Sequence, residues 1–440
     1  MSRLDPADLQ GNILRGYPQP HAAYLFVGVD DAGAGRAWLG ELVREVTRES
    51  GFPSGLASTL NVALTYKGLA ALQLDQAKLD AFPEDFRYGM AARCHELGDV
   101  GPSAPSKWED GLGRGEAHVL VTLYGAEKGV RDQRLRECET RVREDRGLRI
   151  VGNPHRADLL PKAREHFGFA DGFSQPAVVG SDRPAHGAGV QQRFRRWRHL
   201  RLGEFVLGHR DEDGVVPGRD VALLHNGTFM VWRKLAQDVP LFRRWMTELA
   251  GDDPHEFERV AAKVVGRWRQ GASLVRSPDL PTEAGRGKGF TYSKDPDGLR
   301  CPLGAHVRRA NPRDALGWRT ERTKRHRIIR RGLPYGPRLA EGASDVEGKR
   351  HERGLIFVCL NASIARQFEL IQSHWLLDGD AFGLGRDQDL LVAPADPEGK
   401  MTVQGRPPRF LAPQEQLVTT RGGEYLFVPG IAALRALAGD

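Results

Sequence analysis

The sequence predicts an α+β fold of two ferredoxin-like lobes, each with an antiparallel sheet flanked by helices. Three observations predict it. Strand patterns and helical patterns alternate along both halves, and 440 residues are enough for two such lobes. A stretch rich in Gly, Pro and polar residues, VVGSDRPAHGAGVQQR at 178–193, lies between the halves and is typical of a linker. We therefore expect an N-terminal lobe at residues 1–190 and a C-terminal lobe at 191–440.

Alternating apolar and polar side chains predict the strands, at 24–30, 60–66, 118–124, 355–361 and 424–428. Helical periodicity predicts helices at 36–47, 68–72, 131–145 and 363–377, and in the last of these Ile364, Phe368, Ile371 and Trp375 share a face. The first strand, YLFVGVD, is echoed by YLFVPG at 425–430, which indicates an internal duplication.

Composition places the chain among globular proteins. Hydrophobic residues make up 40% and charged residues 28%, a balance unlike that of disordered proteins. No apolar run approaches the roughly 20 residues of a membrane span. The start, MSRLDPADLQGNILRGY, has no signal-peptide core and no twin-arginine pair, so we expect a cytoplasmic protein. The four cysteines are far apart, which favours reduced thiols over disulfides or a zinc cluster.

The net charge of +7 is concentrated in two arginine clusters, at 193–201 (RFRRWRHLR) and 319–331 (RTERTKRHRIIRR). Such clusters form solvated faces, bind nucleic acid or acidic lipid, or hold an anionic cofactor inside the protein. The nearly continuous charge of the first cluster predicts a surface. Ile328 and Ile329 in the second predict a strand that enters a core. Aromatic and basic residues interleave only at FRRWR, so we expect no nucleic-acid partner.

Three motifs carry side chains that catalyse reactions in other proteins. Asp171 lies in HFGFADGFSQP (166–176), His306 in CPLGAHVRRANPRD (301–314), and Arg330 with Arg331 in IIRRGLPYG (328–336). Each motif alone has a structural explanation, as a turn, a core histidine or a surface arginine pair. Together they fit peroxide chemistry. A histidine binds the iron of a flat macrocycle from one side, while an acid and a fixed positive charge on the other side assist cleavage of the O–O bond.

These motifs resemble the landmarks of the dye-decolorizing peroxidase family. So do QGNILRGY (10–17), GEFVLGHRDEDG (203–214), RGLIFVCLNASIARQFELIQ (353–372) and GGEYLFVPG (422–430), which follow in the order of that family. The resemblance implies a dimeric α+β barrel with one haem b per chain in the C-terminal lobe. It implies a haem peroxidase that reduces hydrogen peroxide and oxidises dyes, phenols or similar aromatic donors through a high-valent iron-oxo intermediate. The alternative is a haem-binding or haem-iron-releasing protein of the same fold.

The resemblance also implies roles for individual residues close to the iron. His306 matches the proximal haem ligand, Asp171 the distal aspartate and Arg330 the distal arginine, with Arg331 as the neighbouring alternative. Asp389 in RDQDLLV matches the acid that accepts the imidazole N–H, and Asp387 is the fallback.

Further from the iron the expected roles concern the walls of the site. Leu355 and Phe357, two residues apart on one strand face, are expected to form an apolar wall over the distal side. Arg308 and His166 are expected to contact the haem propionates. Trp375 matches a relay that carries electrons from bulky surface-bound donors, and core packing explains it equally well.

The expected partners are hydrogen peroxide and aromatic reducing substrates, with no membrane, and a homodimer is the commonest oligomer. The family's twin-arginine leaders and C-terminal encapsulation tails have no counterpart in this sequence, so neither export nor encapsulation is expected. An acidic pH optimum is expected, because Asp171 must cycle a proton near its ordinary pKa of about 4.

Overall fold

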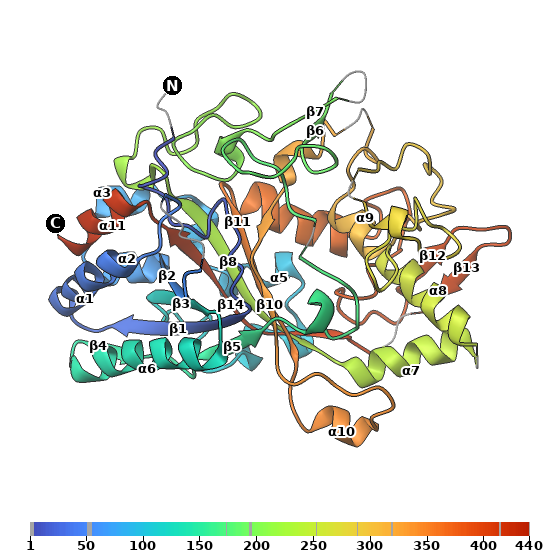
Figure 1. The fold of residues 1–440 in the computed structure, drawn as a ribbon, viewed down its shortest axis with the longest axis horizontal. Helices are drawn as coiled ribbons and strands as arrows, with labels where there is room; N and C mark the ends of the chain where they lie inside the picture. Colours follow the sequence, from blue (N-terminus) through green and yellow to red (C-terminus); the bar gives the residue numbers. More distant parts are fainter. Residues whose placement is uncertain are drawn as a thin grey trace.

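The computed structural model describes residues 4–50, 55–172, 174–192, 196–251, 253–287, 289–317, 320–412 and 415–439 (Figure 1). The strands are β1 (His21–Val29), β2 (Ser58–Leu64), β3 (Val119–Gly125), β4 (Leu148–Ile150), β5 (His155–Asp158), β6 (Val190–Gln191), β7 (Trp197–Arg198), β8 (Thr228–Gln237), β9 (Ile329–Arg330), β10 (Leu333–Tyr335), β11 (Gly354–Asn361), β12 (Met401–Val403), β13 (Arg409–Leu411) and β14 (Val418–Val428). The helices are α1 (Ala32–Glu45), α2 (Tyr66–Ala71), α3 (Gln76–Asp80), α4 (Glu84–Tyr88), α5 (Cys94–Leu97), α6 (Lys128–Glu144), α7 (Val239–Ala250), α8 (Pro254–Val265), α9 (His306–Ala310), α10 (Asp345–Lys349), α11 (Ile431–Ala438) and two π-helical segments, Ala365–Glu369 and Ile371–Leu377.

One antiparallel sheet runs through the molecule in the order β10-β11-β8-β14-β2-β3-β1-β4, with β5 paired to β1 and β9 to β11. The order within the N-terminal half is β4-β1-β3-β2, and that within the C-terminal half is β14-β8-β11-β10. Both are the order of a ferredoxin-like unit. The halves join where Phe427 of β14 pairs with Leu64 of β2. The predicted pair of ferredoxin-like lobes is therefore confirmed.

The two faces of the sheet bury different sets of side chains, as the period of two along each strand requires. In β1, Leu25 and Val27 pack with α1 and α6 on the helix-covered face, whereas Tyr24 and Phe26 pack with Trp232 of β8 on the other face. The edge strands β5 and β10 lie against each other, so the sheet curls toward a barrel with this second face inside.

The predicted duplication pairs the wrong strands. By position in the sheet the counterpart of β1 is β8, whereas β14, which carries the echoing sequence YLFVPG, corresponds to β4. β8 has no alternating pattern to reveal it, because its first six residues, TFMVWR, are all buried. A strand buried on both faces keeps apolar residues at consecutive positions.

Two long connections of the C-terminal half form a separate region with α7, α8, α9 and the hairpin β12–β13 (Figure 1). One connects β8 to β9, and the other connects β11 to β14 after the π-helical segments. A third long segment links β5 to β8 and contains the expected lobe boundary at residue 190, which stays a prediction.

The two arginine clusters differ in exposure, as the sequence predicts, as far as their residues are described. Arg193, Phe194 and Arg195 lie outside the described residues, while Arg196 and Arg201 of the first cluster are exposed. Arg331 of the second reaches inside, where its Nε donates to the Asn12 carbonyl at 2.8 Å.

All four cysteines are free thiols, three of them buried. No helix among the described residues is long and apolar enough to cross a membrane.

Candidate functional site

His306 begins α9, and its ring is held by Asp389 from the β11–β14 connection. His306 Nδ1 lies 2.7 Å from Asp389 Oδ2, and the Asp389 side chain is only 1% exposed. Burial lowers the pKa of His306, but the charge and hydrogen bond of Asp389 more than offset this, so that pKa is raised. Asp387 instead accepts from the Thr402 backbone N–H at 2.7 Å. With the proton on Nδ1, the Nε2 lone pair is left for a ligand, and no partner for Nε2 is found within the described residues.

Asp171 and Arg330 form a second pair, 2.8 Å apart between Oδ1 and Nη1. Burial raises the pKa of Asp171, but the charge of Arg330 and a backbone hydrogen bond at Gly172 outweigh it, so the pKa falls below its usual range. The charge of His306 lowers this pKa further, which places the two pairs close together. The side chains of Asp171, Arg330 and His306 are 37%, 31% and 30% exposed, so an open space adjoins all three.

The Gly-x-x-Asp-Gly motif has a backbone reason for both of its glycines. Gly168 has φ of +101° and Gly172 has φ of +81°, in the left-handed region that side chains disfavour. The chain turns at the two glycines, so that the Asp171 carboxylate lies next to Arg330 and the rings of Phe167 and Phe169 pack in the core.

Gln175 fixes Arg330 against the Asp171 loop, a role that the sequence did not reveal. Its Oε1 accepts from the Arg330 backbone N–H at 2.9 Å, and its Nε2 donates to the Arg330 carbonyl at 3.0 Å and to the Gly172 carbonyl at 3.4 Å. The side chain thus supplies the pair of bonds that a neighbouring strand would supply. The FSQP segment was already part of a quoted motif, but nothing in it singles out the glutamine.

Leu355 and Phe357 lie on the same sheet face as Arg330. Cys359 pairs directly with Arg330 in the ladder, and residues at intervals of two along β11 share its face. Leu355 and Phe357 are half-buried, whereas Ile356 and Val358 between them are buried on the inner face. This shared face agrees with an apolar wall over the distal side, which stays a prediction.

Three further arginines lie near Arg330: Arg267, Arg313 from the motif that contains His306, and Arg327 from the second arginine cluster, one explanation of which was an anionic cofactor. Burial lowers the pKa of Arg267, Arg313 and Arg327 to about 10 each. The charge of Arg327 lowers the pKa of Arg313, and the charges of Arg313 and Arg330 lower the pKa of Arg267. The four cations therefore lie near one another. No partner for the Arg327 guanidinium is found within the described residues. A cation that lacks a partner away from water is costly, so the half-buried Arg327 side chain suits an anion.

Three predicted residues lie apart from the two pairs. Arg308 is 1% exposed and donates to the Cys301 carbonyl at 2.8 Å and to Asp295 Oδ2 at 3.2 Å. His166 is bound through Nε2 to the Tyr335 carbonyl at 2.8 Å, and its burial lowers its pKa to about 4. The structure thus gives neither residue a geometric link to His306.

Trp375, on the second π-helical segment, is 8% exposed and packs with Ile371 and Leu376. The expected face with Ile364 and Phe368 does not form, because those two side chains belong to the main helix-covered core. The wider π-helical turn changes which side chains share a face. Trp375 contacts His326 edge to face at 5.3 Å.

Known proteins resemble this chain in sequence and in fold. A family model described as the DyP dimeric alpha+beta barrel domain matches residues 8–147. The dye-decolorizing peroxidase msp1 of Mycetinis scorodonius is 28% identical, over 99% of this chain and 88% of the relative. The multifunctional dye peroxidase DyP2 of Amycolatopsis sp. (strain ATCC 39116 / 75iv2) is 29% identical, over 98% of this chain and 95% of the relative. A solved dye-decolorizing peroxidase in complex with 2,6-dimethoxyphenol superposes with a TM-score of 0.84 at 26% identity, covering 99% of this chain and all of that one.

The barrel, the two facing pairs and these matches define an oxidoreductase of the peroxidase class. The chain is similar to dye-decolorizing peroxidases along nearly its whole length, and the members of that family are haem enzymes.

Proposed function

We propose that this chain binds one haem b in its C-terminal lobe, reduces hydrogen peroxide, and oxidises dyes, phenols or similar aromatic donors. The observation that carries the proposal is the arrangement of two pairs around one open space, His306 with Asp389 and Asp171 with Arg330. Haem, when bound, supplies the redox chemistry of peroxide reduction.

The residues suit the two requirements of a haem site, a ligand for the iron and cations for the propionates. His306 offers Nε2 to the iron, and Asp389 fixes the tautomer and ring orientation that this requires. The propionates need cations, and half-buried Arg327, whose guanidinium has no partner within the described residues, is a better anchor than Arg308 or His166.

Asp171 and Arg330 handle the proton and the charge. With its pKa lowered, Asp171 is a carboxylate at neutral pH and so accepts a proton from incoming peroxide. It then returns that proton to the departing oxygen. The Arg330 guanidinium, 2.8 Å away, stabilises negative charge as it develops on the peroxide oxygens.

The size of the space beside Arg330 determines which molecules can enter the site and which must be oxidised elsewhere. Leu355 and Phe357 restrict the space beside Arg330 to molecules near the size of peroxide. Bulky dyes are then oxidised elsewhere on the protein, and we keep Trp375 as the proposed relay, although only 8% of it is exposed.

The test is the absorption spectrum of the haem-loaded protein before and after addition of peroxide. The proposal expects a Soret band at one haem per chain that changes when peroxide is added. A band that peroxide leaves unmoved would contradict it and favour the alternative, a haem-binding or haem-iron-releasing protein. That alternative predicts that Asp171→Asn and Arg330→Leu leave the rate of haem transfer to an acceptor protein unchanged.

A further inference from the structure

A pocket of about 500 Å³ lies behind the loop that carries Asp171. Its walls are the loop around residues 160–168, the facing sides of α7 and α8, and the segment 338–342. None of the residues assigned to the haem site lines it except His166, whose ring is bound to the Tyr335 carbonyl. The pocket is therefore a place to ask what else the protein binds.

The cations of this pocket outnumber its available carboxylates. Arg269 pairs with Glu258 at 3.1 Å, and Arg338 pairs with Glu341 at 3.5 Å. Glu165, the remaining carboxylate of the lining, accepts instead from its own loop.

Three further cations are left, Lys162, Arg164 and Arg243, and no carboxylate lies within ion-pair distance of any of them in the described residues. Arg243 donates only to the carbonyls of Leu339 and Ala340, at 3.1 and 2.6 Å. Burial and the charge of Arg269 lower the pKa of Arg243 by more than the charge of Glu341 raises it.

Apolar and aromatic side chains form the rest of the lining. Phe167 lies stacked on Phe242 of α7 with ring centroids 4.5 Å apart, so its position is fixed. Phe257 of α8 lies beneath the Arg269 guanidinium at 5.2 Å, and Leu160 and Leu339 complete the apolar part. A cationic rim over aromatic walls suits a flat ring that carries a negative charge.

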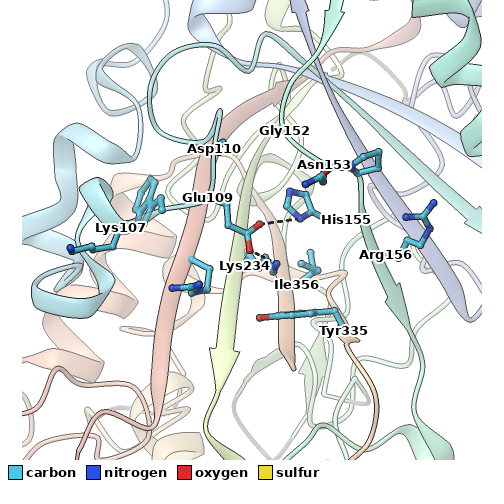
Figure 2. A pocket seen from close by; sticks show the side chains of 13 residues that line it. Lys107, Glu109, Asp110, Gly152, Asn153, His155, Arg156, Lys234, Tyr335 and Ile356 are labelled. Atoms are coloured by element: carbon cyan, nitrogen blue, oxygen red, sulfur yellow. Dashed lines mark hydrogen bonds and ion pairs between the residues drawn. The ribbon is translucent and has the colours of Figure 1, made fainter. Parts of the chain in front are cut away.

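A second pocket, of about 510 Å³, shows what a balanced site looks like (Figure 2). It lies where β5 and β10 meet, and Glu109 sits there between His155 and Lys234. Lys234 pairs with Glu109 at 2.5 Å and with Glu352 at 3.3 Å, and Arg421 pairs with Glu352 at 2.9 Å. Carboxylates of the protein neutralise Lys234 and Arg421, so this second pocket does not need an anionic ligand.

We propose that the pocket behind the Asp171 loop binds an aromatic carboxylate or sulfonate, with the ring between Phe167 and Phe257 and the acid group on Lys162, Arg164 and Arg243. The ligand stiffens the Asp171 loop. Glu165 accepts from the Phe167 and Phe169 N–H groups, both at 2.8 Å, and the Asp171 N–H donates to the Ala163 carbonyl at 2.9 Å. The pocket wall and the site loop are thus one hydrogen-bonded unit.

The experiment is isothermal titration calorimetry of the haem-loaded chain with 2-naphthoate and 2-naphthalenesulfonate. The double variant Lys162→Gln/Arg164→Gln is expected to weaken binding about tenfold for each cation removed. Phe257→Leu keeps the apolar volume and removes the ring face, and is also expected to weaken binding. Hydrogen exchange of residues 160–171 is expected to slow when either ligand is added.

Matched controls separate this site from general attraction to a basic protein. Arg44→Gln/Lys78→Gln removes two exposed cations from α1 and α3 and is expected to leave the affinity unchanged. Equal weakening by both double variants would overturn the proposal, as would sulfate ion binding as tightly as the aromatic acids. Both readouts are independent of peroxidase activity, so a failure here leaves the proposed function standing.

Discussion

Each half of the molecule contains a histidine and an aspartate joined at the same distance, but we propose that only the pair in the C-terminal half binds a metal. His21 Nδ1 lies 2.7 Å from Asp158 Oδ1 in the N-terminal half, and His306 Nδ1 lies 2.7 Å from Asp389 Oδ2 in the C-terminal half. The difference lies in what else each carboxylate touches and where each pair stands in the fold.

Asp158 shares its charge with Arg131 at 3.0 Å and Lys128 at 3.3 Å, and its side chain is 31% exposed. Asp389 is buried, and besides His306 it accepts only from the Leu391 N–H at 3.1 Å among the contacts of the described residues. A buried carboxylate with one strong partner makes that imidazole more electron-rich, whereas a solvated carboxylate that is shared among several cations has a weaker effect on each of them. The comparison teaches that a His–Asp distance alone does not identify a metal ligand.

The largest expected effect separates the two histidines. His306→Ala removes the only nitrogen proposed to bind iron, so we expect loss of stoichiometric haem binding and of the Soret band after reconstitution. His21→Ala is the matched variant and should bind haem as the parent chain does. Equal haem loss in both, measured by absorbance per chain after gel filtration, would contradict the assignment.

Removing the distal pair should spare the haem and slow its reaction. Asp171→Asn removes the proton acceptor, and Arg330→Leu removes the fixed charge. We expect each to slow the reaction with peroxide by about 10²–10⁴-fold in stopped-flow absorbance. Asp158→Asn is the control from the other half. If the two distal variants react at parental rates, the proton and charge roles are wrong.

The next largest effect should separate Asp389, the partner of His306, from Asp158, the partner of His21. Asp389→Asn leaves His306 with a neutral partner, and removing such a partner typically costs about 10–100-fold in affinity or activity. The midpoint potential of the bound haem should rise, because a less anionic imidazole stabilises ferric iron less well. Asp158→Asn should alter neither quantity. An unchanged potential in Asp389→Asn would show that the buried carboxylate does not act through the ring.

Much of this arrangement can be predicted from the sequence, and the remainder depends on contacts between distant segments. The predicted strands at 24–30, 60–66, 118–124 and 355–361 coincide with four strands of the sheet. β8 was missed, although it is buried on both faces as β1 and β3 are.

The site shows the same division. Asp171, His306, Arg330 and Asp389 could be picked out through a family resemblance, with Asp387 as the fallback for Asp389. Arg308 shows the limit of reasoning from proximity in the chain. It lies two residues after His306, yet its guanidinium binds the Cys301 carbonyl and Asp295. Gln175 gains its importance from its hydrogen bonds to Arg330, far away in sequence, which no local pattern records.

The pH dependence should follow the lowered pKa of Asp171. Its carboxylate form, and the ion-pair stability that goes with it, is present above the unfolded pKa of about 3.9 and is lost as pH falls through the lower folded pKa. We therefore expect the peroxide rate constant to be flat from neutral pH to about 5 and to fall roughly tenfold per pH unit below the folded pKa, whereas the ordinary pKa of Asp171 had predicted an acidic optimum. In Arg330→Leu burial acts without its opposing charge, so the fall should begin at higher pH. An inflection that moves down, or stays, would contradict this electrostatic account.

The smallest and most selective effect concerns two buried glutamines, which hold one strand in each half of the sheet. Gln10 clamps Val62 of β2 as Gln175 clamps Arg330 of β9: its Oε1 accepts from the Val62 N–H at 3.0 Å and its Nε2 donates to the Val62 carbonyl at 2.8 Å. Gln10→Leu and Gln175→Leu each leave buried backbone groups unpaired, at a cost of about 1–3 kcal/mol of stability.

Only the second clamp holds a side chain of the proposed site. We expect both variants to unfold at lower urea concentration and to keep their haem. Gln175→Leu alone should also slow the peroxide reaction severalfold and shift its pH profile, because Arg330 is no longer held against Asp171. Gln175→Glu keeps the acceptor for the Arg330 N–H and should recover part of the rate. If Gln10→Leu slows the peroxide reaction as much, the loss reflects general destabilisation, and the clamp on Arg330 has no separate role in positioning.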